Sequence, residues 1–463
     1  MNRIKLVLMF AGIYLSIAGC RKDPAKTDLN PYYYNADWST NSHEKTEPHY
    51  EKVFPQSNIN TIEITLTTAQ WSEITSNMVS LFGISFGANN SIPNQNATNT
   101  DPIYVDANVK FEGKQWKNVG FRLRGNKMLG NIWNSGIYKL PFHLNFDKFE
   151  DQIPGIKNQR FLGFKELVFN PGYKDPSLIR EKLASDIYRM GGLIAPQTAF
   201  YKVYINFGAG MKYCGVYCAA ELPEDNLLLN FIKDKSGNLY KPTSQLNLFQ
   251  AVGFPKKTNE HVGDFSDVQQ FVAQLNNPNR ISNPAQWHAA IEKHLDVNQF
   301  LRWLAISNTM VNPGGYGTSA ENYYLYHVSN GKFIWIPWDN NEVMSSDPGI
   351  VGAAGGNSSD GLSLSMNEVT ANWPLIRYLM DDAIFYQEYK NQLRNFDNNV
   401  WSITALQERV DQYYNLIKPF VIGINGEQIG YSLLTNSSIF ISQKEYLKSH
   451  IYSREQLIRR YAP

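Results

Sequence analysis

The chain has 463 residues, and its 43 basic side chains almost balance its 42 acidic ones, for a formal charge of +1. This length allows two or three domains, or one large domain with extensions. Nucleic acid binding requires a clustered basic surface, so the near-neutral balance argues against a nucleic acid partner. Aromatic residues make up 13% of the chain. Most should pack inside a β-rich protein, and sugar-binding platforms are the alternative use for them.

The amino terminus has the features of an export signal. Residues 2–5 are basic, residues 6–17 are apolar, and small residues precede Cys20. A cysteine at this point resembles the bacterial lipobox, in which it becomes the lipidated first residue of the mature protein. A short transmembrane anchor is the alternative, but the apolar run is shorter than the ~20 residues that a span needs. We predict a lipoprotein signal peptide over 1–19, a polar tether over 20–50, and lipid anchoring through Cys20 at the bacterial cell envelope.

Strand and helix patterns then alternate along the chain. Residues 61–66 alternate as a half-buried strand does, and a short helix follows over 68–74. Asp175-Pro176-Ser177 can cap a helix from about 178 to 190. Further strands are expected at 104–111, 119–126, 138–146, 199–206 and 213–219. Further helices are expected within 266–311 and within 373–421. The class predicted is α+β, with a β-rich amino-terminal lobe and a helical carboxy-terminal part.

The two cysteines that follow Cys20 lie in one predicted strand. Cys214 and Cys218 are four residues apart, which is about 13 Å on an extended chain. This separation exceeds the reach of a disulfide. We expect two buried thiols with no metal or redox role.

A predicted hairpin carries the strongest chemical signal. Asn330-Gly331 separates two apolar and aromatic runs, a pattern typical of a two-residue β-turn. With that turn, Asn322 would face Asp339 across the hairpin, at roughly 4.5–5.5 Å between directly opposed residues. An amide oxygen beside a carboxylate is a plausible cradle for Mg²⁺, which prefers hard oxygen ligands shared with nucleotide phosphates. The alternative is a hairpin whose ends are polar without a function.

Eight short segments occur in the order found in one protein family. The chain resembles the CotH kinase family, whose members are similar to highly divergent protein kinases, from about residue 50 to 421. The segments are 119–126 (VGFRLRGN), 139–142 (KLPF), 161–164 (FLGF), 175–183 (DPSLIREKL), 195–196 (AP), 238–241 (NLYK), 322–326 (NYYLY) and 336–340 (IPWDN). The resemblance implies a kinase-like domain over 51–421, with parts at 51–126, 127–364 and 365–421, and a carboxy-terminal extension over 422–463.

The resemblance also implies ATP- and Mg²⁺-dependent phosphoryl transfer to Ser or Thr of a protein. Asp339 and Asn322 would be the metal ligands, and Lys139 the lysine that neutralises phosphate. Arg180 or Glu181, on the following helix, would pair with Lys139 or with phosphate; an ordinary exposed salt bridge is the alternative. Glu221 follows a strand where the family often has an acidic residue, so it is a further candidate for cofactor binding.

One departure from the family concerns the catalytic base. Members commonly have Asn-Trp-Asp shortly before the hairpin, and here the stretch 312–316 reads NPGGY, with Gly314 at the Asp position. Glycine cannot accept a proton, and general-base help is typically worth 10²–10⁴-fold. Glu321 is a candidate substitute, although its side chain should point to the opposite face of the strand from Asn322. Asp347 and Asp360, in a Gly- and Ser-rich loop, are others.

Three functions remain open from the sequence. The first is a lipid-anchored kinase, impaired by Gly314. The second is a pseudokinase that binds nucleotide and metal but transfers nothing. The third is a surface-binding lipoprotein that uses its aromatic residues to hold a protein or glycan at the cell surface.

Overall fold

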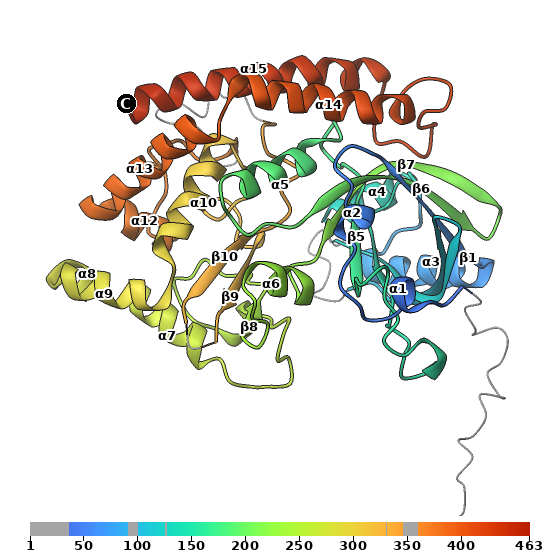
Figure 1. Ribbon diagram of the computed structural model, residues 1–463, viewed down its shortest axis with the longest axis horizontal. Coiled ribbons are helices and arrows are strands. Elements are labelled where there is room, and N and C mark those ends of the chain that lie inside the picture. The colour runs from blue at the N-terminus through green and yellow to red at the C-terminus, as the bar shows by residue number, and fades with distance from the viewer. Residues whose placement is uncertain (1–36, 91–100, 126, 330, 346–359) are drawn as a thin grey trace, which may run out of the picture.

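The computed structural model describes residues 37–90, 101–125, 127–329, 331–345 and 360–463. Cys20, the predicted signal peptide and Asp347 lie outside these ranges. The described chain forms a barrel half and a helical half (Figure 1). No helix among the described residues is long and apolar enough to cross a membrane.

The barrel half contains seven strands. They are β1 (Asn60–Leu66), β2 (Val105–Phe111), β3 (Lys114–Leu123), β4 (Phe142–Asn145), β5 (Glu166–Asn170), β6 (Thr198–Phe207) and β7 (Met211–Glu221). The order around the barrel is β1-β2-β3-β4-β5-β7-β6, and parallel pairing of β1 with β6 closes it. Ile62, Ile64 and Leu66 alternate into its core, as the period of two in this segment predicts.

Helices α1 (Thr40–His43), α2 (Tyr50–Val53), α3 (Thr68–Phe82) and α4 (Lys127–Asn134) belong to the barrel half. Helix α3 begins with a capping box, in which the Thr67 hydroxyl accepts from the Gln70 amide at 3.2 Å and the Gln70 side chain accepts from the Thr67 amide at 2.7 Å. Its apolar face, which includes Ile74, packs into the barrel cluster. The short helix predicted over 68–74 is therefore present, and it continues to Phe82.

Helix α5 (Arg180–Met190) connects the two halves. The helical half then contains α6 (Asp225–Phe231), α7 (Ser266–Leu275), α8 (Asn279–Ser282), α9 (Pro284–His294), α10 (Val297–Thr309), α12 (Pro374–Asp381), α13 (Ala383–Asn399), α14 (Ile403–Val421) and α15 (Ser437–Tyr461). A three-stranded antiparallel sheet in the order β10-β9-β8 lies among them, built from β8 (Asn238–Tyr240), β9 (Tyr323–His327) and β10 (Phe333–Pro337). This sheet carries the predicted metal-binding hairpin.

Helices α14 and α15 run together along one side of the molecule (Figure 1). Phe440, Leu447 and Ile451 of α15 belong to the same core cluster as α5 and α10. The last forty residues, expected to be an extension, therefore share the hydrophobic core of the helical half.

The structure confirms the α+β class but corrects its amino-terminal part. A closed barrel replaces the plain kinase-type β lobe that the family resemblance implied. The strand expected over 138–146 is shorter, because β4 begins only at Phe142, after Pro141. Cys214 and Cys218 are free and buried, as predicted.

Candidate functional site

The β9–β10 hairpin pairs one residue out of the predicted register. Phe333 pairs with His327 and Pro337 with Tyr323, so Asn322 lies opposite Trp338 and not opposite Asp339. The cause is a longer loop: the Val328 amide donates to the Lys332 carbonyl at 3.2 Å, which leaves three residues between them. The predicted two-residue turn is therefore wrong, and Asn330 itself lies outside the described residues. Asn322 and Asp339 still flank the same end of the hairpin, because the Trp338 amide donates to the Asn322 carbonyl at 3.3 Å.

Asp339 lies two residues after the end of strand β10 and has a left-handed backbone conformation, with φ of 55°. This conformation is uncommon outside glycine and is best tolerated by Asn and Asp. The chain turns there, and the next amide, of Asn340, donates to Glu181 Oε2 at 3.0 Å. Burial, and then the charge of Asp339, raise the pKa of Glu181 to about 8. A carboxylate that follows β10 thus lies close enough to one on α5 to influence its protonation.

A chain of amide contacts ties this pair to Gly314. The Asn312 amide group donates to Asn340 Oδ1 at 3.2 Å, and its own Oδ1 accepts from the Gly314 amide at 3.0 Å. A side chain at position 314 would point at Asn322, since an ideal Cβ there lies 2.9 Å from Asn322 Nδ2. Gly314 therefore stands beside the predicted metal ligand, at the place where the family's aspartate is expected.

Two cations that the sequence analysis did not select complete the cluster. Lys241, at the end of β8, donates through Nζ to the Glu321 carbonyl and lies 5.2 Å from the Tyr324 ring. Burial lowers the pKa of Lys241 to about 8, although the charges of Asp339 and Glu321 oppose this. Arg124 donates to Asn170 Oδ1 at 3.2 Å and lies 5.7 Å from the Trp338 ring. Lys241 is the last residue of the family motif NLYK, and Arg124 is the second arginine of the motif VGFRLRGN. These two motifs are the sequence signal that could have identified both cations.

Lys139 lies elsewhere, and its predicted pairing is wrong. Its Nζ is 2.5 Å from Glu427 Oε1, and both side chains have no exposed surface. Glu427 comes from the segment between α14 and α15 and also accepts from the Val216 amide at 2.9 Å. Lys139 therefore joins this segment to the barrel and does not contact Arg180 or Glu181. A partner so distant in sequence has no local signature.

The other candidates are placed as follows. Arg180 is buried, pairs with Asp175 and donates to Gln443 of α15 at 2.6 Å, so it contacts neither Lys139 nor the two carboxylates. Glu221 is buried at the end of β7, where it accepts from the Tyr50 hydroxyl at 2.6 Å. Glu321 is exposed, and its carboxylate is close enough to influence Lys241.

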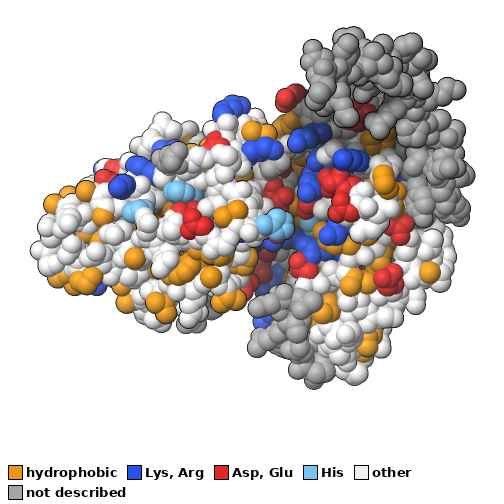
Figure 2. Space-filling view, turned by 90° about the horizontal axis from the view of Figure 1, so that it is seen from below, with side chains coloured by type: hydrophobic (Ala, Val, Ile, Leu, Met, Phe, Trp, Pro, Cys, Tyr) orange, Lys and Arg blue, Asp and Glu red, His pale blue; other side chains and the backbone are white. Residues whose placement is uncertain are grey.

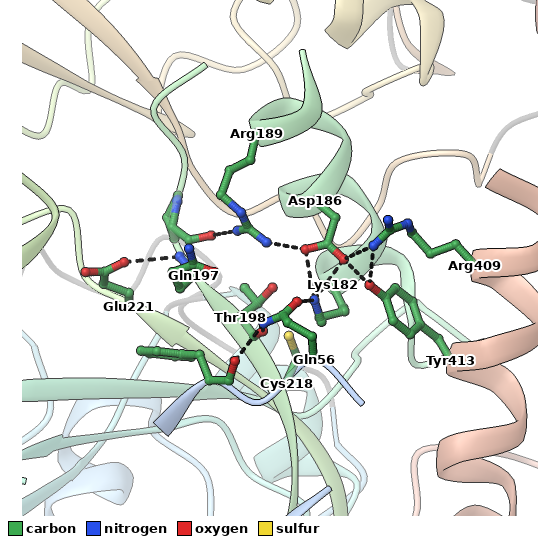
Figure 3. Close-up of polar contacts among 12 residues, drawn as sticks. Gln56, Lys182, Asp186, Arg189, Gln197, Thr198, Cys218, Glu221, Arg409 and Tyr413 are labelled. Carbon is green, nitrogen blue, oxygen red and sulfur yellow. Dashed lines mark hydrogen bonds and ion pairs between the residues drawn. The ribbon is translucent and has the colours of Figure 1, made fainter. Parts of the chain in front are cut away.

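The opposite side of α5 is fixed by a buried ionic cluster. Figure 3 shows Lys182, Arg189 and Arg409 converging on Asp186. Lys182 Nζ lies 2.8 Å from Asp186, and both side chains are at most 4% exposed. Arg409 and Tyr413 reach the same carboxylate from α14. Helix α5 is therefore held against α14, and Glu181 is presented from a rigid element.

Figure 2 shows a cleft in which acidic and basic side chains gather. A pocket of about 620 Å³ opens beside the connection that follows β7. Glu166, Glu221 and Glu224 are among the residues that line it. Burial and the charges of Glu224, Glu166 and Asp339 raise the pKa of Tyr324, which places the pocket and the carboxylate pair around one tyrosine.

The donor set fits a hard divalent cation. Asp339 and Asn322 offer carboxylate and amide oxygens. Burial first, and then the negative charge of Asp339, raise the pKa of Glu181, and a cation would offset that charge. Within the described ranges no three His, Cys, Asp or Glu side chains form a metal cage. Such a donor set suits Mg²⁺, which usually takes one or two carboxylates and completes its shell with phosphates and water.

Similarity to known proteins identifies the family of this chain. The chain is 27% identical over 292 residues to the inner spore coat protein H of Bacillus subtilis (strain 168), an alignment that covers 60% of this chain and 75% of that protein. Among solved structures it is similar to the Shewanella oneidensis MR-1 toxin–antitoxin complex of HipA, HipB and operator DNA, with 10% identity and a TM-score of 0.30 over 64% of this chain and 59% of that chain. The sequence profile of the CotH kinase protein family matches residues 121–458, which include the whole carboxylate and amide cluster. The chain therefore belongs to the CotH kinase protein family.

Proposed function

We propose that the protein binds MgATP in the cleft and slowly transfers the γ-phosphoryl group to a Ser or Thr hydroxyl of a protein. The observation that carries this proposal is the cluster itself: Asp339 and Arg124 both lie close enough to Glu181 and to Lys241 to influence their pKa values. Family membership supports it, since the family is described as a kinase.

Each side chain has a distinct role in this proposal. Asp339, Asn322 and Glu181 hold Mg²⁺, which supplies positive charge to the triphosphate. Lys241 and Arg124 contribute further positive charge to the phosphate oxygens, and the pocket of about 620 Å³ receives the nucleoside. Positioning and charge neutralisation of this kind account for most of the rate in phosphoryl transfer.

The reaction lacks a carboxylate base at position 314. The acceptor oxygen forms a bond to the γ-phosphorus, the bond to the β–γ bridging oxygen breaks, and ADP leaves. With glycine at 314, the hydroxyl proton passes to water or to a phosphate oxygen. General-base help is typically worth 10²–10⁴-fold, so we expect turnover to be slower by about this factor than in a member with the aspartate.

The amino-terminal sequence supports a location at the cell envelope. A lipid on Cys20 would hold the domain to the membrane through the polar tether. The Bacillus relative is named as an inner spore coat protein, which is in keeping with a role at a cell surface. Labelling with a radioactive fatty acid, lost in Cys20→Ser, tests this anchor.

The first experiment measures thermal unfolding with and without MgATP. A ligand at 100 times its dissociation constant should stabilise the native state by about 2.7 kcal/mol. Asp339→Asn keeps a residue that tolerates the left-handed conformation, so it should remove the shift without unfolding the chain. Asp151→Asn, in an exposed loop, is the matched control. No shift in the native protein at millimolar MgATP would refute nucleotide binding.

The second experiment separates a slow kinase from a pseudokinase, the function that Gly314 itself favours. Backbone geometry permits a side chain at 314, since its φ is not left-handed, and the nearest neighbour is the movable Asn322 amide. Gly314→Asp should raise transfer from radiolabelled ATP to protein by about 10²–10⁴-fold. Nucleotide binding without transfer in either form would establish the pseudokinase.

A further inference from the structure

A second pocket, of about 530 Å³, opens next to the site on the helical half. One wall is formed by residues within the segment 243–253, which begins two residues after Lys241. The other wall includes Thr318 and Ala320, just before Asn322. Lys241 joins the two walls, since its Nζ donates to the carbonyl of Glu321.

The walls of this pocket are rigid. The buried hydroxyl of Tyr316 donates to the Gln245 carbonyl at 2.6 Å, and that of Tyr323 donates to the Ser244 carbonyl at 2.8 Å. Turns from Asn312 to Ser319 connect the second wall to Gly314, because the amides of Thr318 and Ser319 both donate to the Gly315 carbonyl. The pocket is thus fixed relative to the position where phosphoryl transfer is proposed.

The lining of the pocket is polar but uncharged. No Asp, Glu, Lys or Arg is among the described residues that line it. Gln245, Asn247 and Gln250 are among the lining residues, and none of their three side-chain amides hydrogen-bonds to another described residue. Each amide offers two donors and an acceptor, the combination that pairs with peptide groups. Leu248 and Trp373 add apolar surface.

We infer that this pocket holds the acceptor protein as a neutral peptide segment, with uncharged residues around the Ser or Thr that is modified. The inference rests on the proposed function for the phosphoryl transfer to the peptide. The preference for a neutral peptide rests on the side-chain amides that form no hydrogen bond within the described chain. A charged side chain would lose water on entry and find no partner in the described lining, which costs free energy. A neutral backbone and small polar side chains instead find donors and acceptors on both walls.

Fluorescence anisotropy tests the inference on the whole protein without nucleotide. Three labelled peptides of equal length carry a central Ser flanked by Ala, Gly and Asn, by Lys, or by Glu. The neutral peptide should bind at least about tenfold more tightly than either charged one. Equal binding, preference for a charged peptide, or displacement of the peptide by a neutral oligosaccharide would overturn the inference.

Charge substitutions at one exposed position identify the site of binding. Gln250→Glu should shift selection toward the Lys peptide, and Gln250→Lys toward the Glu peptide, each by about tenfold. The same substitutions at Gln270, exposed on α7 and outside the lining, should change nothing. If both positions respond alike, peptide binding occurs elsewhere and the inference fails.

Thermal unfolding with MgATP, run in parallel, separates the two proposals. A nucleotide shift without neutral peptide binding contradicts only the inference. In the opposite case the neutral peptide binds, and its binding changes in the Gln250 variants, while MgATP produces no thermal shift. That result contradicts the kinase function and retains the pocket as a peptide site.

Discussion

The buried pair of Lys139 and Glu427 gives a sharp test of which lysine serves the nucleotide. At 2.5 Å and an effective dielectric constant of ~20, the attraction between the two charges is about 7 kcal/mol, most of which offsets the loss of water from both ions. Removing one partner of such a pair typically costs 3–5 kcal/mol, because the other charge stays buried.

The two single substitutions should differ. In Lys139→Met, Glu427 keeps hydrogen bonds from the Val216 amide and the Ser432 hydroxyl, so we expect a loss near 3 kcal/mol. In Glu427→Leu, the Lys139 ammonium has no other hydrogen-bond acceptor among the described residues, and the Val216 amide and the Ser432 hydroxyl also lose their partner. A loss near 5 kcal/mol is expected there. The double variant should be more stable than the Glu427→Leu single variant.

Urea unfolding measures these losses, and the MgATP-induced thermal shift measures binding. We expect each folded variant to keep the nucleotide shift, because Lys139 does not reach the carboxylate pair. A Lys139→Met protein that is nearly as stable as the native one but no longer responds to MgATP would refute this reasoning and restore Lys139 as a phosphate ligand.

Three further predictions concern other buried groups. Asp186→Asn should cost about 3–5 kcal/mol in urea unfolding, since three cations share this carboxylate, whereas Asp411→Asn at a more exposed pair should cost about 1 kcal/mol or less; equal losses would contradict a tight cluster. Burial raises the pKa of Glu221 from 4.5 to about 7, so the native state holds this proton more firmly than the unfolded state does. The free energy of unfolding that Glu221 contributes should therefore decline as the pH rises from about 4.5 to 7, by up to ~1.4 kcal/mol per pH unit. Glu221→Gln should flatten that part of the pH–stability curve, and an unchanged slope would exclude Glu221 as its source. Lys241→Met should weaken MgATP binding in calorimetry by about tenfold or more while Lys241→Arg retains most of it; an undiminished affinity in Lys241→Met would remove this lysine from the site.

Local rules located most elements but not all of the site. Strand β1 and the start of α5 follow from alternation and from Asp175, whose carboxylate accepts from the Arg180 amide at 2.8 Å. Such signals involve residues close in sequence. The Lys139–Glu427 pair spans 288 positions, so nothing nearby announces it.

The hairpin shows a second kind of error. Its dipeptide signal identified the correct strands but gave the wrong loop length, and one added residue changed the partner of Asn322 from Asp339 to Trp338. The left-handed turn at Asp339 then directed the next amide to Glu181, a consequence of backbone conformation that no pattern of residue types specifies.

The closed barrel sets an order for folding. Strand β1 has two neighbours, β2 and β6, and its parallel register with β6 joins Asn60 to Tyr201. A chain that emerges amino end first must therefore keep one edge of β1 unpaired until residues about 140 positions later arrive. Such long-range pairing is slow to form, and an unpaired edge attracts other strands in the meantime. During synthesis, the interval before β6 emerges is therefore when chaperones would matter most.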